Sequence, residues 1–161
     1  MKNFFRASRG FTLIETMVAV SLIAVGFTAV LSLVTTSFFN VSGIQDRLAA
    51  SNLAMEGIEI ARNIRDGNWL QNKSWNSGLS DGDYQAAYNS ASLGSYNGDF
   101  LLLDSNSGFY GYDSGAPTVY IRKISVANLS SYELKVVSTV SWQRRGTNYS
   151  ISAEDHLFNW K

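Results

Sequence analysis

The first part of the chain is dominated by hydrophobic positions. No charged residue occurs from Thr16 to Gln45. A helix needs about 20 apolar residues to cross the roughly 30 Å hydrocarbon core of a membrane, and this stretch is longer than that. We therefore predict one long helix over residues 11–66, of which the first half, residues 11–37, crosses a membrane.

The second half of the predicted helix, residues 38–67, is amphipathic and carries apolar positions at helical spacing on two faces. One stripe contains Ile44, Leu48, Met55 and Ile58, and the other contains Leu53, Ile60, Ala61 and Ile64. Two stripes suit a helix that packs on a sheet on one side and on sister helices on the other. Gly67 is the expected helix end, because glycine often follows the last helical residue.

Charged residues alternate in sign along the end of this helix. Glu59 with Arg62, and Arg62 with Asp66, stand at spacings that allow ion pairs on one helical face, each worth about 0.2–0.5 kcal/mol. The pattern favours a solvated face, and a docking patch for another subunit is the alternative.

The region after the helix is polar. Residues 68–117 are rich in Gly, Ser, Asn and Asp, and they predict a variable loop region with one short strand, LLLD, that begins at Leu101. Asp104 to Gly108 is similar to the start of a calcium-binding loop. However, that loop needs a glutamate at its twelfth position and a glycine where Phe109 stands, so we predict a surface turn.

The last region, residues 118–161, alternates apolar and polar positions as strands with one buried face do. The alternating runs are 118–126, 133–142 and 148–158. Arg145-Gly146-Thr147 marks a tight turn between the last two runs. We therefore predict an antiparallel sheet with one face on the helix, which makes the fold class α+β.

Composition narrows the chemistry. The absence of cysteine excludes disulfides and thiolate sites. The one histidine, His156, stands near Ser152, Glu154 and Asp155, but neighbours on a strand point to opposite faces, so a catalytic triad is not expected. We predict that the chain is not an enzyme and has no cofactor and no metal site.

Two basic pairs, Arg122-Lys123 and Arg144-Arg145, fall within the predicted sheet. Binding of nucleic acid depends on clustered Lys and Arg side chains that contact phosphates. Because there are only two such pairs and the formal net charge is zero, we do not predict DNA binding as the main function, and it stays an alternative.

The segment before the apolar run, residues 1–10, is short and basic. It contains Lys2, Arg6 and Arg9 and no acidic residue, which predicts a cytoplasmic N-terminus. A secretory signal peptide would have its cleavage site after the apolar run. Here Gly10 precedes the run, so a cut at Gly10 would leave the anchor on the mature protein.

The sequence from Gly10 to Glu15, Gly-Phe-Thr-Leu-Ile-Glu, resembles the G-F-T-L-x-E signature of type IV prepilins. The resemblance implies a pilin fold, with a long N-terminal helix packed on an antiparallel sheet. It also implies that a membrane-embedded prepilin peptidase cuts between Gly10 and Phe11 and then N-methylates Phe11. Residues 56–69 and the C-terminal strands resemble PilV-type minor pilins.

Glu15 is the candidate assembly residue. A carboxylate within a bilayer costs about 2.5–3.5 kcal/mol on insertion scales. Cleavage would free an α-amine at Phe11, which is normally protonated near neutral pH. Pairing of Glu15 with that amine, on its own chain or on a neighbour, would offset the cost and set the axial register of an incoming subunit.

These observations leave three functions open. The first is a structural minor pilin of a type IV pilus, the second a pseudopilin of a type II secretion system, and the third a pilus-mounted adhesin or DNA-uptake receptor. The expected partners are prepilin peptidase, other pilin subunits and the pilus or secretion assembly platform. We expect a single pass through the cytoplasmic membrane, with the C-terminal domain outside, followed by incorporation into a filament.

Overall fold

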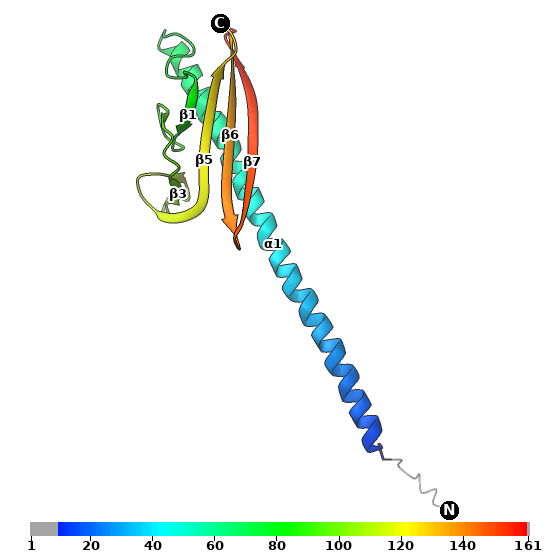
Figure 1. Ribbon diagram of the computed structural model, residues 1–161. Helices are drawn as coiled ribbons and strands as arrows, with labels where there is room; N and C mark the ends of the chain where they lie inside the picture. Colours follow the sequence, from blue (N-terminus) through cyan, green and yellow to red (C-terminus); the bar gives the residue numbers. More distant parts are fainter. Residues whose placement is uncertain (1–9, 161) are drawn as a thin grey trace, which may run out of the picture. The chain divides into compact units, whose positions relative to one another are not determined.

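The computed structural model describes residues 10–160, apart from the side chain of Asn40. The basic residues Lys2, Arg6 and Arg9 therefore lie outside the described residues. The chain divides between Ile44 and Gln45 into two compact units, which we call the N-terminal unit and the head. Helix α1, Leu13–Leu70, begins in the first unit and ends in the second (Figure 1). The predicted long helix is thus confirmed.

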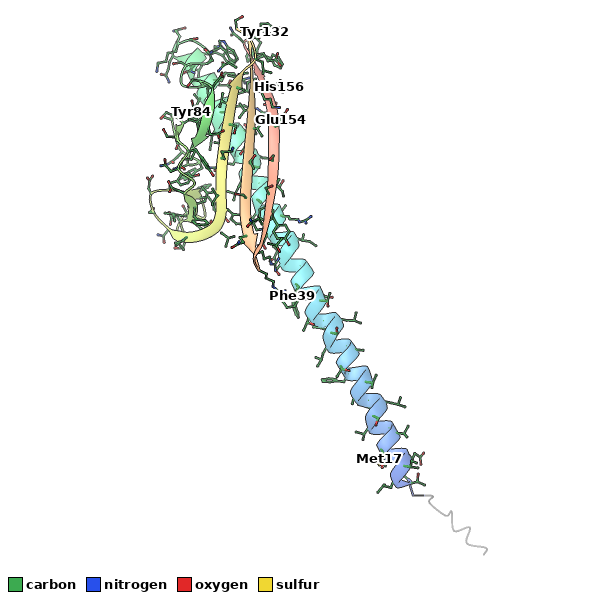
Figure 2. All side chains as sticks on the ribbon, in the orientation of Figure 1. Met17, Phe39, Tyr84, Tyr132, Glu154 and His156 are labelled. Carbon is green, nitrogen blue, oxygen red and sulfur yellow. The ribbon has the colours of Figure 1, made fainter. Side chains whose placement is uncertain are left out.

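The part of α1 in the N-terminal unit has the properties of a membrane-spanning helix. Among the described residues, α1 is the one helix that is long and apolar enough to cross a membrane, with a mean hydropathy of 2.5 over its most apolar window. Its side chains project outward, Met17 and Phe39 among them (Figure 2). Hydroxyl groups are satisfied within the helix: Ser21 Oγ donates to the Met17 carbonyl at 2.8 Å and Thr28 Oγ1 to the Val25 carbonyl at 2.9 Å. Such bonds let polar side chains enter a bilayer without unpaired groups.

The head contains one antiparallel sheet of seven strands. The strands are β1 (Gly82–Gln85), β2 (Gly94–Ser95), β3 (Phe100–Leu103), β4 (Tyr110–Gly111), β5 (Ala116–Asn128), β6 (Glu133–Arg144) and β7 (Thr147–Phe158). Strands β5, β6 and β7 form a meander, and β1 and β3 both pair with the other edge of β5. The predicted α+β fold and its antiparallel C-terminal sheet are confirmed.

The meander follows the alternation that the sequence shows. Along β5 and β6, every second side chain is buried, and the pairing places Tyr120 opposite Trp142 and Ile124 opposite Ser138. Strand β7 pairs only with β6, and most of its side chains are exposed. Arg145 and Gly146, with φ of 52° and 79°, form the two-residue turn between β6 and β7.

The head's part of α1 packs on one face of the sheet (Figure 1). The stripe of Leu53, Ile60, Ala61 and Ile64 is buried, so this stripe is the one that faces the sheet. On the other stripe, Ile44, Leu48 and Met55 are exposed. Ile58 is the exception, because it is only 5% exposed and belongs to the core against β5 and β6. The second stripe is therefore shorter than predicted.

The core is divided in two by a polar layer. One cluster includes Leu53, Tyr120 and Trp142, and the other includes Ile58, Ile124 and Val136. On α1, β5 and β6, one residue of this layer lies between the members of the two clusters: Gly57 on α1, Arg122 on β5 and Ser138 on β6. A Cβ added to Gly57 would lie 2.2 Å from Ser138 Oγ, so the absence of a side chain at Gly57 permits the close approach of helix and sheet.

The helix ends later than predicted. It continues through Gly67 to Leu70, and Asn72 takes the left-handed conformation with a φ of 54°. The Lys73 amide donates to the Asn68 carbonyl at 2.9 Å and the Asn72 amide to the Trp69 carbonyl at 3.2 Å, which is the pattern of a Schellman cap. Asparagine is one of the few residues other than glycine that adopt this conformation. The cap therefore lies at Asn72, and the prediction of a stop at Gly67 was wrong.

The polar middle region contains more strand than predicted. Strand β3 agrees with the predicted LLLD strand, but β1, β2 and β4 were predicted as loop. These strands are two to four residues long and show no run of alternating positions. Strand β1 pairs with β5, β2 with β1, and β4 with β3. These strands are held by their partners rather than by local propensity, which is why the sequence pattern does not reveal them.

Candidate functional site

The start of α1 is built around Thr12. Thr12 Oγ1 accepts a hydrogen bond from the Glu15 amide at 3.2 Å, and the Thr12 carbonyl accepts from the Thr16 amide at 3.1 Å. Thr12 is therefore the N-cap, and Glu15 is the third helical residue. This is the spacing of a capping box, in which the N-cap hydroxyl binds the amide three residues on. This role of Thr12 was not predicted, although the spacing Thr-x-x-Glu is its sequence signal.

The proposed cleavage position lies directly before this cap. Gly10 and Phe11 precede the helix, Gly10 is exposed, and Phe11 is 80% exposed. A Cβ added to Gly10 would meet no atom within 4 Å. The described chain therefore leaves the bond between Gly10 and Phe11 open to a peptidase, and any demand for glycine at this position comes from the enzyme rather than from this fold.

Glu15 lies one helical turn after the cap, in the first turn of α1. Free amide groups give a helix N-terminus a partial positive charge, and a nearby carboxylate is stabilised there by about 0.3–1 kcal/mol. This is less than the cost of placing a carboxylate in a bilayer, so the helix end alone does not compensate for Glu15. A cation beside Glu15 would offset the remaining cost, and a processed Phe11 would supply one.

The Arg122-Lys123 pair does not form a basic surface. Arg122 is 0% exposed, and its Nη1 donates to the Leu53 carbonyl at 3.1 Å and to Glu56 Oε1 at 2.8 Å. Its Nη2 donates to the Ala86 carbonyl. Arg122 thus connects α1 and the segment after β1 to the sheet and is not available for phosphate contacts. Lys123 is half-buried on the opposite face, and its Nζ lies 3.2 Å from Asp83 Oδ2.

The residues around His156 do not form a triad. His156 Nδ1 lies 2.7 Å from Glu133 Oε1, and the Ser152 hydroxyl is 2.8 Å from Thr139 Oγ1. Asp155 instead accepts a hydrogen bond from Arg62 Nη2 at 2.9 Å. Figure 2 shows His156 beside Glu154 on β7. His156 Nε2 lies 3.6 Å from Glu154 Oε1, but the Ser152 hydroxyl and the Asp155 carboxylate are bound to Thr139 and Arg62 and not to His156.

The charged end of the helix uses partly different pairs from those predicted. Arg62 bonds with Glu59, as predicted, but its other partner is Asp155 on β7 and not Asp66. Asp66 pairs with the adjacent Arg65 at 2.8 Å. Arg62 therefore joins the helix to the edge strand of the sheet. Neither the prediction of a solvated face nor its alternative, a docking patch, included this contact.

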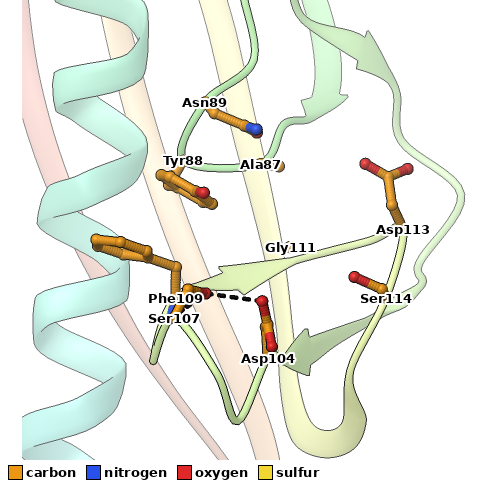
Figure 3. A pocket seen from close by; sticks show the side chains of 9 residues that line it. All are labelled: Ala87, Tyr88, Asn89, Asp104, Ser107, Phe109, Gly111, Asp113 and Ser114. Atoms are coloured by element: carbon orange, nitrogen blue, oxygen red, sulfur yellow. Dashed lines mark hydrogen bonds between the residues drawn. The ribbon is translucent and has the colours of Figure 1, made fainter.

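A small open pocket of about 110 Å³ lies between the segment after β1 and strand β4 (Figure 3). Its walls include Asp104 and Asp113 and the rings of Tyr88 and Phe109, which stack with centroids 4.4 Å apart. Hydrogen bonds from the Asn106 amide and the Ser107 hydroxyl hold the pKa of Asp104 below its ordinary value. The carboxylate is thus engaged by its own turn, in agreement with the predicted surface turn.

The pocket gives no metal centre. Within residues 10–160, no group of three or more His, Cys, Asp or Glu side chains is placed to hold a metal ion. A volume of about 110 Å³ is also below the roughly 300–1,000 Å³ that is usual for small-molecule sites. The strongest functional signal therefore stays at the N-terminus.

Comparison with known proteins agrees with this emphasis. A family model described as the prokaryotic N-terminal methylation motif matches residues 5–31, a range that includes Gly10, Phe11 and Glu15. No curated protein and no solved structure matched the chain. The match is confined to the N-terminus, so it says nothing of the surface of the head.

Proposed function

We propose that the chain is a type IV pilin-like protein of the prepilin type and, within that class, a structural minor pilin that is cut after Gly10 and N-methylated at Phe11. The methylation motif at residues 5–31 carries this proposal. It is supported by the open position of Gly10 and Phe11 before the capped start of an apolar helix. The subunit would be stored in the cytoplasmic membrane and assembled through α1.

Processing changes the electrostatics of the helix start. Before the cut, residue 11 is an uncharged peptide unit. After the cut, its amine adds a positive charge next to the N-cap, four residues before Glu15. An amine and a carboxylate so placed, within one chain or between two, neutralise one another in a medium where each alone would be costly. Cleavage would thus create the cation that Glu15 requires for insertion into a filament.

The exposed side of α1 supports a role in assembly. Leu48 and Met55 are 61% and 52% exposed on the helix face that the sheet does not cover. Together with the apolar N-terminal unit, they would pack against other subunits around a filament axis. The polar region 68–117 would form much of the outer surface.

A type II secretion pseudopilin is the second candidate, because the same motif and helix support it equally. The hypothesis of a DNA receptor is weaker, because Arg122 is buried and one of the two basic pairs is therefore not available to contact phosphates. The two filament types are distinguished by the phenotype of a deletion strain. Loss of surface pili with normal protein export supports the minor pilin, and loss of export with normal pili supports the pseudopilin.

Processing is tested by mass spectrometry of the membrane-extracted and filament-bound protein. We expect an N-terminal peptide that begins with methylated Phe11 in strains with an active prepilin peptidase. Gly10→Val should leave the leader attached, whereas Gly10→Ala tests how small the residue must be, since an added methyl group meets nothing in this chain. An intact Met1 on assembled filaments would refute the proposal.

A further inference from the structure

The turn between β6 and β7 lies against the first helical residues of the head. Arg144 Nη1 is 3.1 Å from Asp46 Oδ2, and the Tyr120 hydroxyl donates to the Asp46 carbonyl at 3.5 Å. Asp46 is the second residue of the head. These contacts are all within the head, so they place the turn where α1 enters it, whatever the angle between the two units.

This corner of the head is basic. It contains Arg47, Arg144 and Arg145, with Asp46 as the one nearby acid in the same segments. Removal of residues 1–10 would leave 10 of the 13 basic residues and all 13 acidic ones. The corner thus has an excess of positive charge, while the rest of the processed chain has an excess of negative charge.

The conformation of the turn adds a second observation. Arg145 has a φ of 52°, in the left-handed region, and Gly146 follows with a φ of 79°. A two-residue hairpin turn of this kind prefers Asn or Asp at its first position, and other residues are strained there. An arginine in this position gives up some local stability and places a positive charge at the tip of the hairpin.

Chain length sets how far this corner can lie from a membrane. Phe38 and Phe39 follow the apolar segment, and α1 continues without a break to Arg47. Nine helical residues at 1.5 Å each carry the chain only about 13 Å beyond Phe38. The headgroup layer is itself about 5–8 Å thick, and charges act over a Debye length of about 8 Å. Arginine side chains at this corner are therefore within reach of lipid phosphates.

An aromatic group beside the turn fits the same environment. Tyr149 stacks on Trp142, its cross-strand partner, with centroids 5.6 Å apart, and it is 37% exposed. Tyrosine and tryptophan favour the membrane interface, where an apolar ring and a polar group are both accommodated.

From this corner we propose that Arg47, Arg144 and Arg145 dock the head onto anionic phospholipid headgroups while the subunit waits in the membrane. The inference rests on the proposed membrane storage. Docking would hold the head close to the bilayer until an assembling filament lifts the subunit out. A phospholipid is favoured over nucleic acid because the anchor brings the membrane to this corner, while the corner offers only three arginines for a DNA backbone.

The chain contains no cysteine, so a single label can be placed without a competing thiol. The full chain with Thr147→Cys, labelled with a donor dye, is inserted into vesicles of neutral phosphatidylcholine or of a mixture with phosphatidylglycerol. The vesicles carry an acceptor dye on a headgroup. Energy transfer should rise with the anionic lipid and fall again in 0.5 M salt, because screening weakens the contact.

Charge variants identify the residues. Arg47→Gln with Arg145→Gln, which keeps the Arg144–Asp46 pair, should reduce the ratio of docked to free heads by about fivefold for each arginine removed. The matched control, Lys73→Gln with Lys135→Gln, removes the same charge elsewhere on the head and should leave energy transfer unchanged. An equal effect of both pairs, or no difference between the two lipid mixtures, would overturn the proposal.

Two further readouts separate this proposal from others. Resistance to carbonate extraction shows whether the chain is inserted: failure there counts against membrane storage, whereas insertion without lipid-dependent transfer counts only against docking. A short DNA duplex that binds with the same dependence on Arg47 and Arg145, while anionic vesicles have no effect, would assign the corner to nucleic acid and refute docking on lipid.

Discussion

At the scale of single residues, two charged side chains differ in where their compensating partners lie. Arg122 is buried in the head, but the Leu53 and Ala86 carbonyls and Glu56 compensate its charge within the chain. Glu15 is exposed in the isolated subunit, and the described residues contain no cation beside it. Arg122 is therefore expected to matter for folding, and Glu15 for assembly.

Arg122→Ala should destabilise the head by about 3–5 kcal/mol, because it leaves buried carbonyl groups unpaired and opens a cavity. Glu56→Gln should cost less, since the Glu56 side chain is 30% exposed and water can replace part of the interaction. Urea unfolding followed by tryptophan fluorescence measures both. Equal costs for the two variants would contradict this account of Arg122.

Glu15→Val should be expressed, cut and kept in the membrane, but should be largely missing from sheared filaments. Glu15→Asp should be intermediate, since it keeps the charge but has a shorter reach. Immunoblots of membrane and filament fractions give the ratio. Normal incorporation of Glu15→Val would reject the pairing with the Phe11 amine or place the subunit at a tip, where no earlier subunit exists, and immunogold labelling distinguishes these two cases.

Tyr120 should give the head a pH dependence at high pH. Burial, with a smaller effect from the nearby Asp46, raises the pKa of Tyr120 from 10.0 to about 12. The unfolded chain therefore loses this proton first, so the stabilisation is complete below about pH 10 and is lost as the pH rises towards 12. Between pH 8 and pH 11, the urea midpoint should fall more for the native chain than for Tyr120→Phe. Parallel slopes would exclude this role.

At the scale of elements, the packing of α1 on β6 depends on Gly57. Glycine lowers helix stability by about 1 kcal/mol relative to alanine, so its presence here reflects space. A new Cβ would lie 2.9 Å from Ser138 Cβ and 3.3 Å from Arg122 Cδ. The sheet therefore fixes both the height and the rotation of the helix at this position.

Gly57→Ala should reduce the free energy of unfolding by about 1–3 kcal/mol, in spite of alanine's better helix propensity. Ser138→Gly removes the clashing atoms, so the double variant should be more stable than the sum of the two single effects predicts. Gly67→Ala is the control, because a Cβ there comes no closer than 4.0 Å to the Gln71 side chain. Additive effects of Gly57→Ala and Ser138→Gly would disprove the close contact.

At the scale of the whole molecule, the two units differ in how their apolar side chains are buried. The core side chains lie between Ala50 and Leu157, and the exposed large apolar residues concentrate before Ile44. The head therefore has what it needs to fold alone, and the N-terminal unit requires a membrane or other helices.

A fragment that begins at Gln45 should be soluble and monomeric, with a circular dichroism spectrum of mixed helix and strand. Analytical ultracentrifugation measures its mass. A purely helical spectrum would show that the head does not fold without the N-terminal unit. Association with vesicles that persists at high salt would show that the head itself exposes an apolar surface.

The sequence pattern was informative wherever one physical force dominated. Long apolar and alternating runs predicted α1 and the β5–β7 meander, and the Gly10–Glu15 motif predicted the N-terminal methylation motif that the family model matches. The pattern failed where a partner distant in sequence decides the structure, as for β1, which pairs with β5. Arg122 was predictable in part: alternation with Tyr120 and Ile124 places it on the helix-facing side, but its charge suggested the surface instead.

The polar layer around Arg122 also determines how the molecule would respond to a pulling force. Load applied along α1 reaches the head first at Asp46, which contacts Arg144 and Tyr120, and then at the Leu53 carbonyl, to which Arg122 donates. Turns before Ala50 have no head core to hold them, and each residue that unwinds lengthens the chain by about 1.8 Å. Stretching would therefore spread from the anchor and stop at Arg122, so the subunit could act as an extensible spring whose head keeps its shape.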